Sequence, residues 1–166
     1  MTAARQLRKQ HGASIVALAW LLLALSLCPP PSRAATTERI VADWHTGLAI
    51  GGYDPVAFYM DGKPVPGSPD VELHYAGAIW RFSNVGNREA FAARPDVYLP
   101  QFGGYDPIGV SRGVAVAGNP SLWLITGGRL FLFYDHRRLE MFTSDPARFI
   151  AEAQRKWPDV LSTLSP

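Results

Sequence analysis

Two aspartates, Asp54 and Asp106, each follow the same tripeptide, Gly-Gly-Tyr, and each precede a proline. If these segments belong to related halves of one fold, the two carboxylates can meet in a shared cleft. Two carboxylates joined by an imidazole from His74, His136 or His45 would suit a borderline or hard divalent ion such as Zn, Cu(II) or Mn. The sequence therefore predicts a candidate metal site formed by Asp54, Asp106, His74 and His136.

A structural role for the same residues stays open. An aspartate before a proline in a turn commonly accepts hydrogen bonds from its own backbone. His74 is expected on the polar face of a hairpin, opposite Ile79, where it can be a surface residue. His136 is expected in the first turn of a helix, where the helix dipole disfavours its charged form. Two acids without paired His or Cys spacing are not by themselves a metal signature.

Two tyrosines, Tyr53 and Tyr105, precede the aspartates and could line the same cleft as ligand- or cofactor-binding side chains. Aromatic residues at equivalent positions can also be parts of a core. The chain has no Gly-x-Ser-x-Gly or His-Glu-x-x-His pattern, and its glycine pairs lack the Lys-Ser/Thr of a phosphate loop. The sequence therefore favours a protein that is not an enzyme, and an enzyme with a carboxylate site stays as an alternative.

The elements that must position these residues repeat along the chain. The Gly-Gly-Tyr-Asp-Pro words lie 52 residues apart, and from residue 67 onward the offset is 51. This pattern predicts an internal duplication, with a first half at about residues 51–102 and a second half at about 103–158. Identical residues recur in order: Gly67, Pro69, Leu73, Gly77, Phe82, Glu89, Phe91 and Pro95 as Gly118, Pro120, Leu124, Gly128, Phe133, Glu140, Phe142 and Pro146.

Each half contains a predicted β-hairpin, with strands at 71–75 and 78–82 and at 122–126 and 129–133 around central glycines. Two-residue turns would make the following pairs face the core: Leu73 with Trp80, Val71 with Phe82, Leu124 with Phe131, and Leu122 with Phe133. The second hairpin is apolar on both faces, which is typical of a strand pair covered on both sides. We therefore place it inside and the first hairpin nearer solvent.

Helices are predicted after each hairpin. Asn84 and Asp135 are suitable N-cap residues, and Asp145 can cap a further helix that has Pro146 at its first position and ends at Pro158. The predicted fold is α+β, an antiparallel sheet from two β-hairpin–helix pseudo-repeats with helices packed on it. The domain would span 51–158, between an N-terminal segment (35–50) and a C-terminal tail (159–166).

Residues 1–34 have the pattern of a secretory signal peptide. Basic residues precede an apolar run from Ala13 to Leu27, and small residues stand at Ser32 and Ala34. The run is shorter than the roughly 20 apolar residues that span a bilayer. We expect cleavage after Ala34 on the general secretory route, giving a periplasmic or secreted protein with no membrane span.

Removal of this segment changes the charge of the protein. The segment contains four of the 16 Lys and Arg residues and none of the 14 Asp and Glu residues, so the remainder has 12 bases against 14 acids, a formal charge of −2. This balance argues against nucleic acid as a partner. The only cysteine, Cys28, leaves as well, so the remaining domain has no disulfide and relies on its hydrophobic core. We also expect it to be a monomer.

Ordered motifs run through the chain after residue 34: Gly52 to Phe58, Asp61 to Gly67, the strand pair around Ala76 to Ala78, Asn87 to Phe91, Pro95 to Tyr105, and Asp145 to Pro158. Together they resemble the exported YHS-domain proteins of bacteria, over essentially the whole chain after residue 34. The resemblance implies a metal-binding module, because related members contain cysteines and occur beside heavy-metal and copper transport modules. This chain has Asp106 and Ala57 where related motifs have cysteine, so a soft Cu(I) site is not expected.

Three functions follow from these patterns. The first is a periplasmic YHS-type binding module for a divalent metal, Cu(II) or Zn, or for a small ligand, in a cleft between the halves. The second is a ligand-free interaction or structural domain with an unknown protein partner. The third is an enzyme with a carboxylate site.

Overall fold

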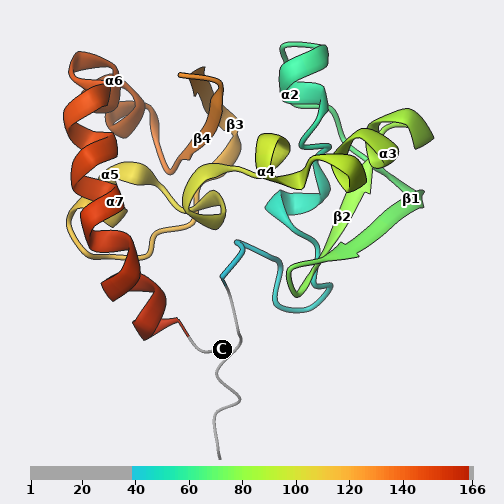
Figure 1. The fold of residues 1–166 in the computed structure, drawn as a ribbon, viewed down its shortest axis with the longest axis horizontal. Helices are drawn as coiled ribbons and strands as arrows, with labels where there is room; N and C mark the ends of the chain where they lie inside the picture. The colour runs from blue at the N-terminus through green and yellow to red at the C-terminus, as the bar shows by residue number, and fades with distance from the viewer. Residues whose placement is uncertain (1–38, 165–166) are drawn as a thin grey trace, which may run out of the picture. The chain divides into compact units, whose positions relative to one another are not determined.

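Residues 39–164, which the computed structural model describes, form a domain of mixed helix and strand (Figure 1). The predicted signal segment, 1–34, lies outside the described residues. The α+β class predicted from the sequence is confirmed. In chain order the elements are η1 (Ile50–Gly52), α2 (Ala57–Met60), β1 (Ser68–Tyr75), β2 (Ala78–Phe82), α3 (Val85–Ala93), α4 (Pro95–Tyr98), η2 (Gln101–Gly104), α5 (Pro107–Ser111), β3 (Asn119–Thr126), β4 (Arg129–Phe133), α6 (His136–Ser144) and α7 (Pro146–Thr163).

Both predicted hairpins are present, but they form two sheets. Strands β1 and β2 pair in one antiparallel sheet, and β3 and β4 pair in another. The prediction of a single sheet is therefore wrong for the described residues. The physical reason is that side chains pack on both faces of β4, so the second hairpin is joined to the rest by apolar contacts and not by a shared hydrogen-bond ladder.

The register of each hairpin agrees with the prediction near the turn and departs from it at the far end. Leu73 pairs with Trp80, and Leu124 pairs with Phe131, as predicted. The other two predicted pairs are wrong, because Phe82 lies opposite Ser68 instead of Val71. In the second hairpin, Phe133 lies opposite Asn119 instead of Leu122. An irregularity interrupts the ladder at this point in both hairpins.

Prolines and glycines explain this irregularity. Pro69 and Pro120 follow the last pairing residues and have no N–H to donate to the ladder. Just before these residues, a Cβ on Gly67 would collide with Arg81, and a Cβ on Gly118 would collide with Leu132. The chain therefore crosses its partner strand too closely for a side chain and leaves the ladder early.

Side-chain caps start the helices after the hairpins, as predicted. The side chain of Asn84 accepts a hydrogen bond from the N–H of Asn87 (2.9 Å), and Asp135 accepts one from the N–H of Arg138 (2.8 Å). Asp145 caps α7 with Pro146 in its first turn. The predicted end of α7 at Pro158 is wrong. The helix continues to Thr163, because Val160 beyond the proline is buried and its packing holds the last turn.

The segment before residue 51 is part of the domain and not a separate arm. The N–H of Val41 donates to Gly103 O (2.8 Å), which joins this segment to the start of the second half. The N–H of Ala49 donates to Ile79 O (2.9 Å) on β2. Ile50 is buried in the core. The residues between 39 and 50 therefore tie both halves of the chain together.

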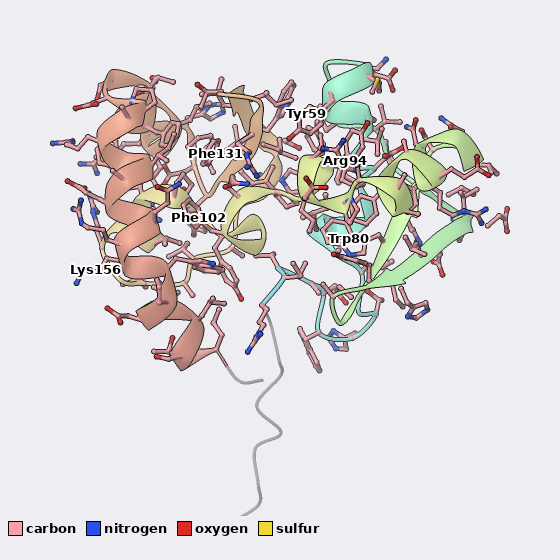
Figure 2. The ribbon with its side chains drawn as sticks, viewed as in Figure 1. Tyr59, Trp80, Arg94, Phe102, Phe131 and Lys156 are labelled. Atoms are coloured by element: carbon pink, nitrogen blue, oxygen red, sulfur yellow. The ribbon has the colours of Figure 1, made fainter. Side chains whose placement is uncertain are left out.

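Strand β4 separates two apolar cores. Leu130 and Leu132 belong to the first core, which contains Trp80, and the alternating Phe131 and Phe133 belong to the second core (Figure 2). Successive side chains of a strand point to opposite faces, so one strand serves both cores. All four side chains are buried, in agreement with the inner position predicted for the second hairpin. The first core also contains Ile50, Phe58, Phe82 and Phe91, and the second contains Phe102, Tyr105, Ile108, Phe142, Phe149 and Val160.

Within residues 39–164, no helix has the length and apolar character needed to cross a bilayer.

Because β4 serves both cores, we predict that Leu132→Ala and Phe133→Ala each destabilise the whole domain. Each deletion should lower the free energy of unfolding by about 2–5 kcal/mol. Urea unfolding followed by far-UV circular dichroism and by tryptophan fluorescence should give one coincident transition in each variant. Ser121→Ala, at an exposed site on β3, should change stability by less than about 0.5 kcal/mol. Two separated transitions in either core variant would show that the cores unfold independently.

Candidate functional site

Asp54 is a fully buried carboxylate that joins three segments of the first half. Its Oδ1 accepts hydrogen bonds from the backbone N–H groups of Val56 (2.9 Å) and Ala57 (3.3 Å) in the following turn. Its Oδ2 accepts from the N–H and hydroxyl of Ser83, just after β2 (2.8 and 2.7 Å). The same oxygen accepts from Asn87 Nδ2 on α3 (2.7 Å). The carboxylate therefore holds the turn, the hairpin and the helix together.

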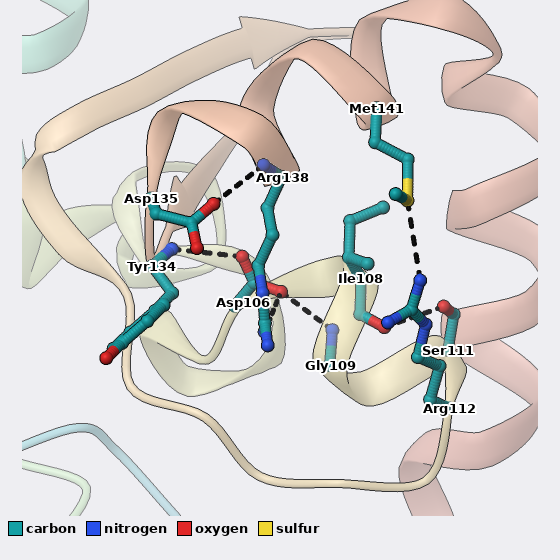
Figure 3. Close-up of polar contacts among 9 residues, drawn as sticks. All are labelled: Asp106, Ile108, Gly109, Ser111, Arg112, Tyr134, Asp135, Arg138 and Met141. Carbon is teal, nitrogen blue, oxygen red and sulfur yellow. Dashed lines mark hydrogen bonds and ion pairs between the residues drawn. The ribbon is translucent and has the colours of Figure 1, made fainter.

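Asp106 makes the corresponding contacts in the second half and is also fully buried (Figure 3). As the N-cap of α5, it accepts a hydrogen bond at Oδ1 from the N–H of Gly109 (2.7 Å). Its Oδ2 accepts from the N–H of Tyr134, just after β4 (3.0 Å). Arg138 Nη1 on α6 donates to Oδ1 (3.0 Å) and forms an ion pair with it. A guanidinium thus takes the place that a neutral amide has in the first half.

The structure supports the structural role of these aspartates. Every hydrogen bond given above for Asp54 comes from the first half, and every one for Asp106 comes from the second half, so none of these donors bridges the two carboxylates. Residues 39–164 contain no group of three or more His, Cys, Asp or Glu side chains that could hold a metal ion. His74 is exposed on β1 opposite Ile79, and His136 is exposed at the start of α6. Neither imidazole takes part in the hydrogen bonds given above for the two aspartates.

The two tyrosines belong to different cores. Tyr53 is half-buried and packs against the first core. Tyr105 is buried in the second core, where its ring lies 6.1 Å from the ring of Trp157. Their positions agree with the alternative that repeated aromatic residues are core components, and each tyrosine contributes to the packing of its own half.

A pocket that the sequence analysis missed lies on the second half, between α5 and α6. It has a volume of about 180 Å³ and is lined by Ile108, Arg112, Asp135, Arg137, Arg138 and Met141. Comparison of the halves could have revealed it. At the offset of 51, Gly86 and Asn87 stand where the second half has Arg137 and Arg138. The offset changes from 52 to 51 before residue 67, so Met60 or Asp61 stands where the second half has Arg112. The three arginines are thus found in one half alone.

Contacts around this pocket hold two of its arginines. The Arg138 side chain is about one quarter exposed, 24%, and its guanidinium lies over the ring of Tyr134 at 5.3 Å. On the α5 side, Arg112 Nη2 lies 3.5 Å from Met141 Sδ on α6. Figure 3 shows Arg112 and Arg138 on either side of Ile108. The pocket therefore has an apolar part and a cationic rim.

Two titratable groups outside the pocket have shifted pKa values. Hydrogen bonds from the N–H and hydroxyl of Thr46 (2.8 and 2.9 Å) hold the pKa of the exposed Asp43 carboxyl below its ordinary value. These bonds order the turn that carries Trp44 and His45. Burial raises the pKa of Tyr59, whose hydroxyl donates to Val97 O (2.9 Å). Both shifts have a structural cause and neither group lines the arginine pocket.

Comparison with protein-family models, with curated proteins and with solved structures finds no match to this chain. The carboxylates of the site are directed inward to the protein's own donors, and its cations line a surface pocket.

We predict that Asp54→Asn and Asp106→Asn both destabilise the domain, with or without metal. In either variant an amide NH₂ would face N–H donors, and leaving a buried donor unpaired costs about 1–3 kcal/mol. Thermal unfolding with EDTA, and then with Zn or Cu(II), should show the same loss of stability under each condition. A metal-dependent rise in the melting temperature of the wild type that both variants lack would instead identify the aspartates as ligands.

Proposed function

We propose that this chain is an exported binding module of the YHS kind, built by duplication, which binds a small ligand in the arginine-lined pocket of its second half. The resemblance in the ordered motifs from Gly52 to Pro158 supports the family. The observation that carries the binding function is the pocket itself, because its cationic residues have no counterpart in the first half.

The duplication is supported by contacts as well as by sequence. Asp54 and Asp106 contact the residue that follows the second strand of their hairpin, Ser83 or Tyr134, and a side chain on the next helix, Asn87 or Arg138. Ser83 and Tyr134 are 51 residues apart, and so are Asn87 and Arg138, which is the offset of the sequence repeat. If the two halves had independent origins, nothing would require them to make the same contacts at the same spacing.

The contacts of the aspartates favour a small ligand in the pocket over a metal ion at the two carboxylates. The oxygens of both aspartates already accept at least one hydrogen bond each, from donors within the domain. A metal ion at either carboxylate would have to displace contacts that join the turn, the hairpin and the helix. The pocket between α5 and α6 requires no such displacement, and it is accessible beside the exposed Arg112 and Arg137.

The binding function can be tested by ¹⁵N NMR with four probes of different charge: glucose, putrescine, citrate and inorganic phosphate. At least one probe should shift the amide signals of residues 108–112 and 135–141 in a saturable manner, because these residues surround the pocket. Signals of the matching segments of the first half, 56–60 and 84–90, serve as the internal control. If no probe shifts the pocket signals selectively, the proposed function is wrong.

Export has its own test. Expression of the full chain in a bacterial host, followed by cell fractionation and mass spectrometry, should yield a periplasmic protein that begins at Ala35. Replacing the small residue before the cut, in Ala34→Phe, should block processing, since the signal peptidase requires a small side chain there. Recovery of the unprocessed wild-type chain from the cytoplasm would contradict export.

A further inference from the structure

We infer that the pocket of the second half binds a phosphate-type oxyanion, either free phosphate or the terminal phosphate of a small phosphomonoester. This inference rests on the proposed function, because it names the ligand class of the same pocket.

The charge of the pocket favours an anion. Three arginines, Arg112, Arg137 and Arg138, line it together with a single acidic residue, Asp135. This carboxylate already accepts the N–H of Arg138 (2.8 Å) as the N-cap of α6. Counting the buried Asp106 behind Arg138 as well, three positive charges face two negative ones. The pocket keeps a net positive charge, and the carboxylates of Asp135 and Asp106 both accept hydrogen bonds from backbone N–H groups.

Arg138 is positioned before any ligand arrives. Its Nη1 is held by Asp106 (3.0 Å), and its guanidinium lies over the Tyr134 ring. A guanidinium has five N–H donors, so this ion pair leaves others for a ligand. Because the side chain is already fixed, binding costs less conformational entropy than it would for a free arginine.

The arrangement suits a tetrahedral oxyanion better than a carboxylate. The arginines come from two elements, Arg112 after the end of α5 and Arg137 and Arg138 from the first turn of α6. Several donors from different directions match the several oxygens of phosphate, whereas a carboxylate has two oxygens in one plane. The N-terminal end of the nine-residue α6 adds the positive end of its dipole.

The first half shows that the fold does not require these charges. There, the amide of Asn87 makes the contact to Asp54 (2.7 Å) that Arg138 makes to Asp106. Gly86 is the counterpart of Arg137, and α2 ends at Met60 and Asp61 where α5 is followed by Arg112, so neither position has a positive charge in the first half. A neutral residue fills the structural role there, and Arg112 and Arg137, which make none of the Asp106 contacts given above, are available for a separate function.

Calorimetric titration of the purified protein with inorganic phosphate, at ionic strength held constant with sodium chloride, tests the inference. Wild type should bind one phosphate saturably. Arg112→Gln and Arg137→Gln, both at exposed positions, should each weaken binding about tenfold, the effect expected when one charge-assisted hydrogen bond is lost. Their melting temperatures should stay close to that of the wild type, since neither side chain contacts Asp106 in the structure.

Arg155→Gln is the matched control, because it removes an exposed arginine from α7 outside the pocket. It should leave phosphate binding unchanged. Equal weakening by Arg155→Gln would show diffuse attraction to a surface charge and would overturn the inference. Unchanged binding in the Arg112→Gln/Arg137→Gln double variant, or no saturable binding by the wild type, would overturn it as well.

One further probe, glycerol 3-phosphate, separates the sources of the phosphate group, and the four earlier probes separate the two proposals. Tighter binding of glycerol 3-phosphate than of phosphate would identify a phosphomonoester, and the reverse order would identify the free ion. If glucose, putrescine or citrate shifts the pocket signals while phosphate does not, the oxyanion inference fails and the binding function stands. If none of the probes binds, both proposals fail.

Discussion

A buried carboxylate that accepts hydrogen bonds from three separate segments is the interaction on which each half of this fold depends. Asp54 and Asp106 are fully buried, and each joins a turn, the end of a hairpin and the following helix. Burial of a charge is costly unless donors surround it. The donors here are backbone N–H groups of the turn and of the hairpin end together with a side chain of the helix, so the requirement to satisfy the carboxylate also sets the relative position of the three segments.

The same constraint is met differently in the two halves. A neutral amide from Asn87 completes the contacts of Asp54, whereas the guanidinium of Arg138 completes those of Asp106. Removing one partner of a buried ion pair leaves the other charge uncompensated, but Arg138 also reaches the surface and lines the pocket. The second half therefore links its internal carboxylate to a surface pocket through one side chain.

Strand β4 explains how two small halves make one stable domain. A segment of about fifty residues buries too little apolar surface to be stable by itself without further support. With Leu130 and Leu132 on one face and Phe131 and Phe133 on the other, β4 lets each core use the second hairpin as a wall. The segment from residue 39 to 50 strengthens this connection, because Val41 bonds to Gly103 and Ala49 bonds to Ile79.

The sequence by itself determined the local features: the hairpins, the caps Asn84, Asp135 and Asp145, and the pairing of Leu73 with Trp80, because these depend on period, turn chemistry and neighbouring residues. It left open whether Asp54 and Asp106 were ligands or internal acceptors. Only the tertiary structure decided that their donors, Ser83 and Tyr134 among them, surround each carboxylate separately. It also decided that Arg112 and Arg137 line one pocket with Met141. These contacts join residues about 25–30 positions apart in sequence, and no local periodicity specifies which distant side chains will meet once the cores have packed.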